Sequence, residues 1–150
     1  MKGLIVEGPS DRAFVLELAK RLRASVEVRM AGRGWRKIAA YVRELLMIGC
    51  DKVMVVSDSH CSEPEAWSRF ISRKLREQGL GRYLDEGKLK LCVVVHALEA
   101  WLLADEEALT DFLGSRAKVR VSPEGPCRPD EVLDGVFCRA TGSRKRYDKG

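Results

Sequence analysis

The sequence predicts an α/β protein built on a mostly parallel four-stranded sheet with helices on both faces. Four short apolar runs are spaced along the first 95 residues, and stretches with a helical spacing of apolar residues separate them. Such alternation is typical of parallel sheets, because each crossover lays its helix over the sheet. We expect a compact, Rossmann-like domain over residues 1–113 and a weakly structured basic extension over 114–150 that packs on the same domain.

The first two expected strands flank an amphipathic helix. Residues 4–6 form an apolar run that turn residues stop, which indicates a buried strand. Ser10 is placed to cap the next helix, and Asp11 in the first turn meets the positive end of its dipole. Phe14, Leu18 and Leu22 then recur at helical spacing, which predicts an amphipathic helix over 11–23 with these residues on its inner face. Residues 26–30 alternate apolar and polar side chains, which predicts a strand nearer the sheet edge.

The same order continues through the middle of the chain. After a glycine-rich loop, residues 35–46 carry the clearest helical stripe, and Gly49 is placed to end that helix. Residues 53–56 are typical of a central parallel strand. Pro64 suits the first turn of the following helix, and the glycines at 79 and 81 are expected to break the chain.

The remaining elements are expected to be one strand and several short helices. Residues 89–95 form the fourth apolar run. Short helices are predicted over 97–104 and 106–113. Beyond Gly114 the pattern weakens, with a further helix predicted over 130–138 and a frayed end over 143–150.

Composition narrows the class of protein. Of the 150 residues, 45% are apolar and 33% are charged, which suits a folded domain with its own core. No apolar run approaches the ~20 residues of a membrane helix, and the N-terminus lacks a signal-peptide pattern. Five cysteines without CxxC spacing and two histidines fit no zinc template. We expect a soluble, cytoplasmic protein that does not bind membranes.

The net charge of +5 is unevenly distributed. Residues 20–43 contain eight basic side chains and one acid, Glu27, and residues 114–150 contain nine basic and five acidic side chains. A positive face suits a polyanionic partner such as DNA or RNA. A well-solvated surface is the alternative interpretation.

Acids follow three of the predicted strands. Glu7 ends the first, Asp58 follows the third, and the fourth runs through His96 to Glu99. The carboxyl ends of parallel strands meet at one edge of a sheet, so these acids are expected to lie together. Clustered carboxylates repel one another unless a cation neutralises them, and their oxygens suit Mg²⁺ or Mn²⁺. A metal ion bound by these carboxylates, with basic groups nearby, can promote phosphoryl chemistry, because it binds phosphate oxygens and lowers the pKa of an attacking water.

Three segments resemble the Toprim domains of topoisomerases, DnaG-type primases, small ribonucleases and OLD-family nucleases. Val6-Glu7-Gly8, with Asp11 four residues after the glutamate, looks like the first Toprim motif. Residues 55–60 sit where the Asp-x-Asp motif belongs. Residues 96–105 are similar to the "EAWLLAD" segment of an uncharacterised, OLD-nuclease-like Toprim family. The resemblance covers residues 3–110.

This resemblance implies a compact Toprim fold in which Glu7 is the general acid or base and Asp58 and Glu99 hold Mg²⁺ or Mn²⁺. His60 stands where the second aspartate of the Asp-x-Asp motif belongs. Imidazole is a poor ligand for Mg²⁺ but acceptable to Mn²⁺ or Zn²⁺. Three alternatives stay open. The site prefers another metal and His60 is a ligand, or Glu63 replaces the missing aspartate as a ligand, or this chain has lost activity.

Basic residues near the end of the second strand are candidates for binding phosphate. They are Arg33, Arg36 and Lys37, and an arginine can engage two phosphate oxygens at once. A solvated first helical turn is the alternative, although basic groups there oppose the helix dipole. Asp11 is a candidate supporting residue or a helix cap, and the basic tail at 143–147 is either a nucleic-acid contact or a solvated segment.

Two hypotheses for the function follow. The first is a metal-dependent phosphodiester enzyme acting on DNA or RNA, a Toprim/OLD-like nuclease. The second is a catalytically degenerate Toprim module that binds nucleic acid, a nucleotide or a protein partner. His60 in place of the second aspartate favours the second hypothesis, as does the expected lack of a fused ATPase or helicase domain in 150 residues. A homodimer or a partner ATPase is compatible with either hypothesis.

Overall fold

The computed structural model describes residues 1–147, so the end of the predicted basic extension, 148–150, lies outside the described residues. The chain forms two compact units. The first comprises residues 1–57 and 65–93, and the second comprises residues 58–64 and the chain from Val94 onward. Each unit is described by itself below.

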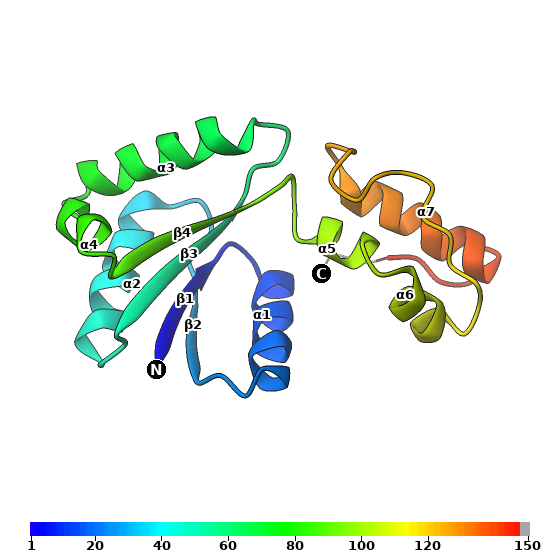
Figure 1. Ribbon diagram of the computed structural model, residues 1–150, viewed down its shortest axis with the longest axis horizontal. Helices are drawn as coiled ribbons and strands as arrows, with labels where there is room; N and C mark the ends of the chain where they lie inside the picture. The colour runs from blue at the N-terminus through cyan, green and yellow to red at the C-terminus, as the bar shows by residue number, and fades with distance from the viewer. Residues whose placement is uncertain (148–150) are drawn as a thin grey trace. The chain divides into compact units, whose positions relative to one another are not determined.

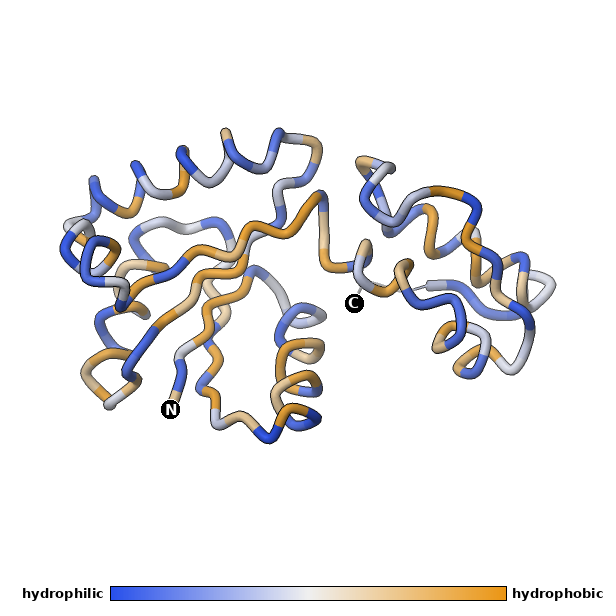
Figure 2. Tube along the Cα trace, viewed as in Figure 1, coloured by the Kyte–Doolittle hydropathy of each residue, from blue (hydrophilic) through white to orange (hydrophobic). Residues whose placement is uncertain are grey.

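A four-stranded, all-parallel sheet confirms the predicted fold class. Its strands are β1 (Lys2–Val6), β2 (Val26–Met30), β3 (Lys52–Asp58) and β4 (Leu89–Val94), in the order β2-β1-β3-β4 (Figure 1). The register pairs Ile5 of β1 with Arg29 of β2 and with Val55 of β3. Apolar residues predominate in β1, β3 and β4 (Figure 2), as expected for strands covered on both faces, whereas β2 alternates apolar and polar residues.

The strand order determines which face each helix covers. The chain steps from β1 to β2 in one direction and from β2 to β3 and β4 in the other. Because such crossovers are right-handed, α1 (Pro9–Arg21) covers one face, while α2 (Trp35–Met47) and α3 (Pro64–Glu77) cover the opposite face (Figure 1).

The main core lies between the sheet and the α2–α3 layer. Val42 and Leu45 of α2 and Ile71 and Leu75 of α3 are fully buried against the strands. Gly3 of β1 allows α2 to approach closely, because a Cβ at this position would lie 3.0 Å from Cδ1 of Leu45. Helical periodicity in the sequence therefore identified the residues of α2 and α3 that pack on the sheet. It was wrong for α1, where Leu18 and Leu22 are exposed and Val15 and Ala19 are the buried apolar residues.

Two further local predictions in this unit are wrong. Ser10 is not the N-cap of α1, because the helix begins at Pro9, two residues before its predicted start, and Gly8 occupies the cap position. Proline is preorganised for the first helical position, which fixes the start. The segment expected to be broken at Gly79 and Gly81 contains a short helix, α4 (Gly81–Asp85), that begins at the second glycine.

The second unit is helical. It contains α5 (Glu99–Leu103), α6 (Glu106–Leu113) and α7 (Pro129–Thr141), and its core is formed around Leu103, Leu109, Leu133 and Val136. The Asp105 side chain caps α6 by accepting a hydrogen bond from the backbone N–H of Ala108. The predicted helices at 97–104 and 130–138 are thus present with shifted ends.

A disulfide that the cysteine spacing does not predict joins Cys61 and Cys127. It links the loop after β3 to the segment before α7, both within the second unit. Cys50 and Cys92 are free thiols, and burial raises the pKa of each. In the described residues no helix has the length and apolar character needed to cross a membrane.

Truncating the centre of the main core should destabilise the protein strongly. Leu45→Ala removes a fully buried side chain of α2 and is expected to lower the free energy of unfolding by about 2–5 kcal/mol. Met47→Ala, on the same helix but 86% exposed, should change it by less than ~0.5 kcal/mol. Urea denaturation followed by circular dichroism measures both, and equal losses would contradict the packing of α2 on the sheet.

Candidate functional site

The carboxyl ends of β1 and β3 form the topological switch point of the sheet. These neighbouring strands are followed by connections that leave in opposite directions, one toward β2 and the other toward β4. In open parallel sheets this geometry leaves a crevice in which ligands bind. Glu7 directly follows β1, and Ser57 lies near the end of β3.

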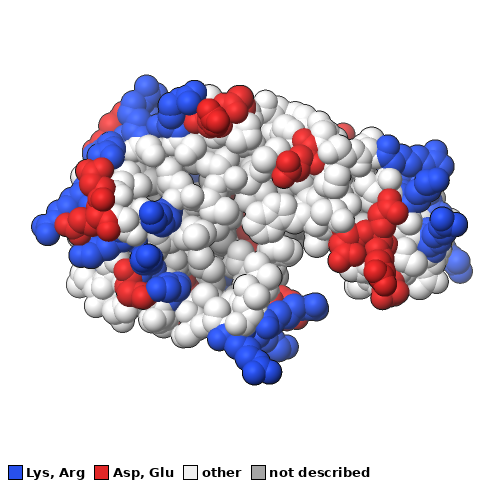
Figure 3. All heavy atoms as spheres, in the orientation of Figure 1, with Lys and Arg blue, Asp and Glu red and all other residues white. Residues whose placement is uncertain are grey.

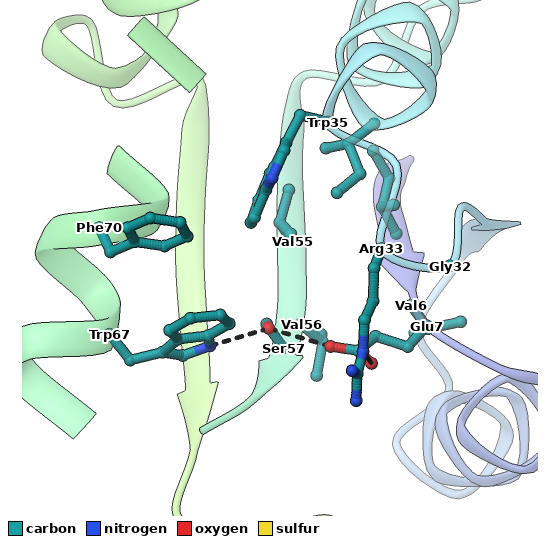
Figure 4. Close-up of a pocket in the computed structure, with 12 residues that line it drawn as sticks. Val6, Glu7, Gly32, Arg33, Trp35, Val55, Val56, Ser57, Trp67 and Phe70 are labelled. Atoms are coloured by element: carbon teal, nitrogen blue, oxygen red, sulfur yellow. Dashed lines mark hydrogen bonds and ion pairs between the residues drawn. The ribbon is translucent and has the colours of Figure 1, made fainter. Parts of the chain in front are cut away.

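A pocket of about 240 Å³ opens at this switch point, entirely within the first unit (Figure 4). Its floor is formed by Ile5 and Val6 of β1 and by Val55 to Ser57 of β3. The loop carrying Gly32 and Arg33 and the start of α2 form one wall, and α3 forms the other. One wall therefore follows β2 and the other follows β3, and both lie on the face of the sheet covered by α2 and α3.

A hydrogen-bonded chain crosses the pocket at its polar end. The Ser57 hydroxyl donates to Oε1 of Glu7 at 3.2 Å and accepts a hydrogen bond from Nε1 of Trp67, also at 3.2 Å (Figure 4). The other carboxylate oxygen of Glu7, Oε2, lies 3.7 Å from Nε of Arg33. Glu7 is thus held between a hydroxyl and a guanidinium, with its carboxylate at the pocket (Figure 4).

Three aromatic rings form the apolar end of the pocket. The rings of Trp67 and Phe70 on α3 stack at 5.1 Å between centroids, with an interplanar angle of 14°. The ring of Trp35, at the start of α2, meets Phe70 edge-on at 5.8 Å and 72°. All three rings are only partly buried, so they pack against the core and also face the pocket.

The predicted phosphate-binding residues lie on this side of the first unit. Arg33 lines the pocket and its side chain is 75% exposed. Arg36 and Lys37 lie in the first turn of α2 and are exposed. The structure therefore places Arg33 at the pocket, and Arg36 and Lys37 on the helix turn that begins with the pocket residue Trp35.

The positive charge of residues 20–43 is partly compensated by ion pairs. Arg21 pairs with Glu17 and Arg29 pairs with Glu44, at 3.0 and 2.7 Å. On the face shown in Figure 3, basic and acidic side chains lie in small mixed groups. Counting the basic residues of this segment in the sequence therefore overstates the positive charge of its surface.

The other predicted acids belong to the second unit. Asp58, the last residue of β3, is 6% exposed. Glu99, the first residue of α5, is 3% exposed and accepts a hydrogen bond from the hydroxyl of Tyr147 at 3.0 Å. The predicted set is thus divided between the units, with Glu7 in the first and Asp58 and Glu99 in the second.

His60 has a backbone conformation that is unusual for a residue with a side chain. Its φ is 50°, and its N–H donates to the backbone carbonyl of His96 at 2.8 Å. Nδ1 of His96 contacts the carbonyl of His60 in return. These two histidines, which follow β3 and β4, are therefore joined through the backbone of His60 and both the backbone and the ring of His96.

Among residues 1–147, no three His, Cys, Asp or Glu side chains are arranged to hold a metal ion. Glu63, which the sequence offered as a substitute ligand, is an exposed residue preceding α3. The metal-ligand roles of Asp58, His60, Glu63 and Glu99 therefore stay predictions.

Asp11 makes the contact of a helix cap. The backbone N–H of Gly8 donates to its Oδ2 at 2.9 Å, and the side chain is buried in the first turn of α1. This contact satisfies a backbone donor at the helix start and places negative charge at the positive end of the dipole.

The basic tail is anchored within the second unit as far as Tyr147. Nη2 of Arg146 lies 2.6 Å from Oδ2 of Asp134, and this guanidinium lowers the pKa of Asp134. The backbone N–H of Tyr147 donates to the same carboxylate at 3.1 Å. These contacts hold the ring whose hydroxyl reaches Glu99, so this segment is packed rather than frayed.

Sequence reasoning missed three residues of these networks. Ser57 and Trp67 connect to Glu7, and Tyr147 connects to Glu99. Ser57 carries one usable signal, because it is a polar residue inside an otherwise apolar strand at its carboxyl end. Comparison with known proteins adds no assignment, since no family model, curated protein or solved structure matches the chain.

Removing the Asp11 carboxylate should cost helix stability. Asp11→Ala leaves the N–H of Gly8 without its acceptor and is expected to lower the free energy of unfolding by about 1 kcal/mol. Glu17→Ala, on the exposed face of α1, should stay within ~0.5 kcal/mol. Thermal and urea unfolding measure the difference, and a wild-type stability for Asp11→Ala would refute the capping role.

Proposed function

We propose that this chain is a Toprim-like enzyme that performs divalent-metal-dependent phosphodiester chemistry on nucleic acid. The observation that supports this most directly is the position of Glu7. Its carboxylate lies at the switch point of a parallel sheet, held by Ser57 and next to Arg33. This is the position that the resemblance to the first Toprim motif gives to the general acid or base.

The surroundings of Glu7 suit proton transfer at a phosphate. Ser57 fixes one carboxylate oxygen by donating to Oε1. The second oxygen, Oε2, faces the exposed guanidinium of Arg33, which can bind a phosphate oxygen and bring the reacting group to the carboxylate. Oε2 is therefore the atom proposed to take up or deliver the proton.

The neighbouring basic residues supply further phosphate contacts. Arg36 and Lys37 are exposed in the first turn of α2, one helical turn from Arg33. Lys37 also packs its ammonium group over the ring of Tyr41, 5.7 Å from the centroid. In this proposal the three cations hold the sugar-phosphate backbone and carry no sequence preference.

The roles of Asp58 and Glu99 follow from the resemblance. They are proposed as ligands of Mg²⁺ or Mn²⁺, with His60 favouring Mn²⁺ if it coordinates. The bound cation would neutralise phosphate charge and lower the pKa of an attacking water. A partner ATPase or a second copy of the chain is compatible with this chemistry.

Cleavage of nucleic acid should depend on Glu7. Plasmid DNA, single-stranded DNA and RNA are incubated with the protein in Mg²⁺ or Mn²⁺, and products are resolved on denaturing gels. Glu7→Gln should lower the cleavage rate by at least ~100-fold, because positioned proton transfer contributes about that much. Asp58→Asn should give a comparable loss, whereas Glu17→Gln, an exposed control on α1, should not change the rate.

Two results would contradict the enzymatic proposal. Cleavage that is unaffected by Glu7→Gln and Asp58→Asn would indicate a contaminating nuclease. Binding of nucleic acid without any cleavage in either metal would favour the degenerate Toprim module instead.

Nucleic-acid binding should fall steeply with salt. Each phosphate neutralised contributes a slope of about −0.9 for duplex and −0.7 for single strands in log K against log[salt]. Arg36→Gln and Lys37→Gln should each weaken binding and reduce the slope by roughly one contact. Fluorescence anisotropy with Arg82→Gln as an exposed control from α4 measures this, and unchanged slopes would exclude α2 as the phosphate-binding element.

A further inference from the structure

We infer that the pocket at the switch point is a binding site for one unpaired nucleobase of the nucleic acid. This inference rests on the proposed function for the identity of the ligand, and it assigns that function a substrate class, single-stranded or unpaired nucleic acid. Trp35, Trp67 and Phe70 would contact the base, and Arg33 its phosphate.

The size of the pocket fits this ligand. A cavity of ~150 Å³ accommodates a benzene molecule, and this pocket measures about 240 Å³, which leaves room for the larger ring system of a base. It opens on the side where Arg33 is exposed. A ring can therefore enter while its attached sugar and phosphate remain at the rim.

The aromatic wall is held in place before a ligand arrives. The indole N–H of Trp67 donates to Ser57, and its ring stacks on Phe70. Trp35 is held from the other helix by its edge-on contact with Phe70. A preorganised aromatic surface can stack on a base at little entropic cost, and stacking tolerates any base because every base has a π face.

The polar end of the pocket places a phosphate next to Glu7. Arg33 is the exposed cation at the pocket and lies 3.7 Å from the Glu7 carboxylate. A nucleotide with its base against the aromatic wall would therefore present its phosphate to Arg33 and its reacting bonds to Glu7. Bases inside a duplex are stacked on their neighbours, so only an unpaired or extruded base can enter.

Binding is tested without cleavage, in the presence of EDTA. A fluorescein-labelled oligothymidine of about twelve residues, within the usual range of single-strand site sizes, is titrated with the protein. A chain of abasic sugar-phosphates of equal length and a duplex of the same length are the matched probes. The oligothymidine should bind roughly ten-fold or more tightly than the abasic chain, since stacking adds to the phosphate contacts.

Variants then locate the site. Trp67→Leu removes the stacking surface and should weaken oligothymidine binding by roughly five- to a hundred-fold, with little effect on the abasic chain. Trp67→Phe keeps a ring and should retain most of the affinity. Trp101→Leu is the matched control, because Trp101 lies in the second unit and outside the pocket. Oligothymidine should still quench the remaining tryptophan fluorescence of this control.

The outcomes separate this inference from the proposed function. Equal affinity of the unaltered protein for the oligothymidine and the abasic chain would overturn it, even if Trp67→Leu does not fold. So would unchanged binding by a folded Trp67→Leu variant, although an active nuclease would still support the proposed function. Base-dependent, Trp67-dependent binding by a protein that cleaves nothing would support the pocket and contradict the enzymatic proposal.

Discussion

The Ser57 hydroxyl is the contact on which the candidate site depends. It donates to Glu7 and accepts from Trp67, so it connects the end of β1, the end of β3 and helix α3 through a single oxygen. A hydroxyl can do this because it is both a donor and an acceptor. The contact links the carboxylate of Glu7 to the indole of Trp67 in the aromatic wall through one hydroxyl.

That contact exists because of the strand order. Placing β1 next to β3 brings Glu7 and Ser57, fifty residues apart, within hydrogen-bonding distance. The same order puts α2 and α3 on one face, where Trp35 and Trp67 can share Phe70 as a neighbour. The site is therefore a consequence of topology, and the loops contribute mainly Gly32 and Arg33.

Local sequence patterns were sufficient to predict the sheet, but they did not predict the structure of the segments that connect its strands and helices. Each strand and long helix has its own periodicity, and the all-parallel sheet follows from their alternation. The start of α1 and the existence of α4 depend on single-residue effects, such as Pro9 at the first helical position. The Cys61–Cys127 disulfide depends on which loops meet in three dimensions, and cysteine spacing alone does not contain that information.

For the candidate site, sequence reasoning located Glu7 and Arg33 but did not identify Trp35 or Trp67 as part of a site. Helical spacing can place such residues on the inner face of a helix, yet it cannot show that the inner faces of α2 and α3 meet at a pocket. Reasoning from the charges of the acidic residues was also incomplete. The expected repulsion among clustered acids was the reason to invoke a cation, whereas Glu7 has Arg33 beside it and Glu99 accepts a hydrogen bond from Tyr147. Since Glu7 and Glu99 each have a local partner, we propose the cation on the basis of the chemistry of phosphate activation rather than of charge balance at the strand ends.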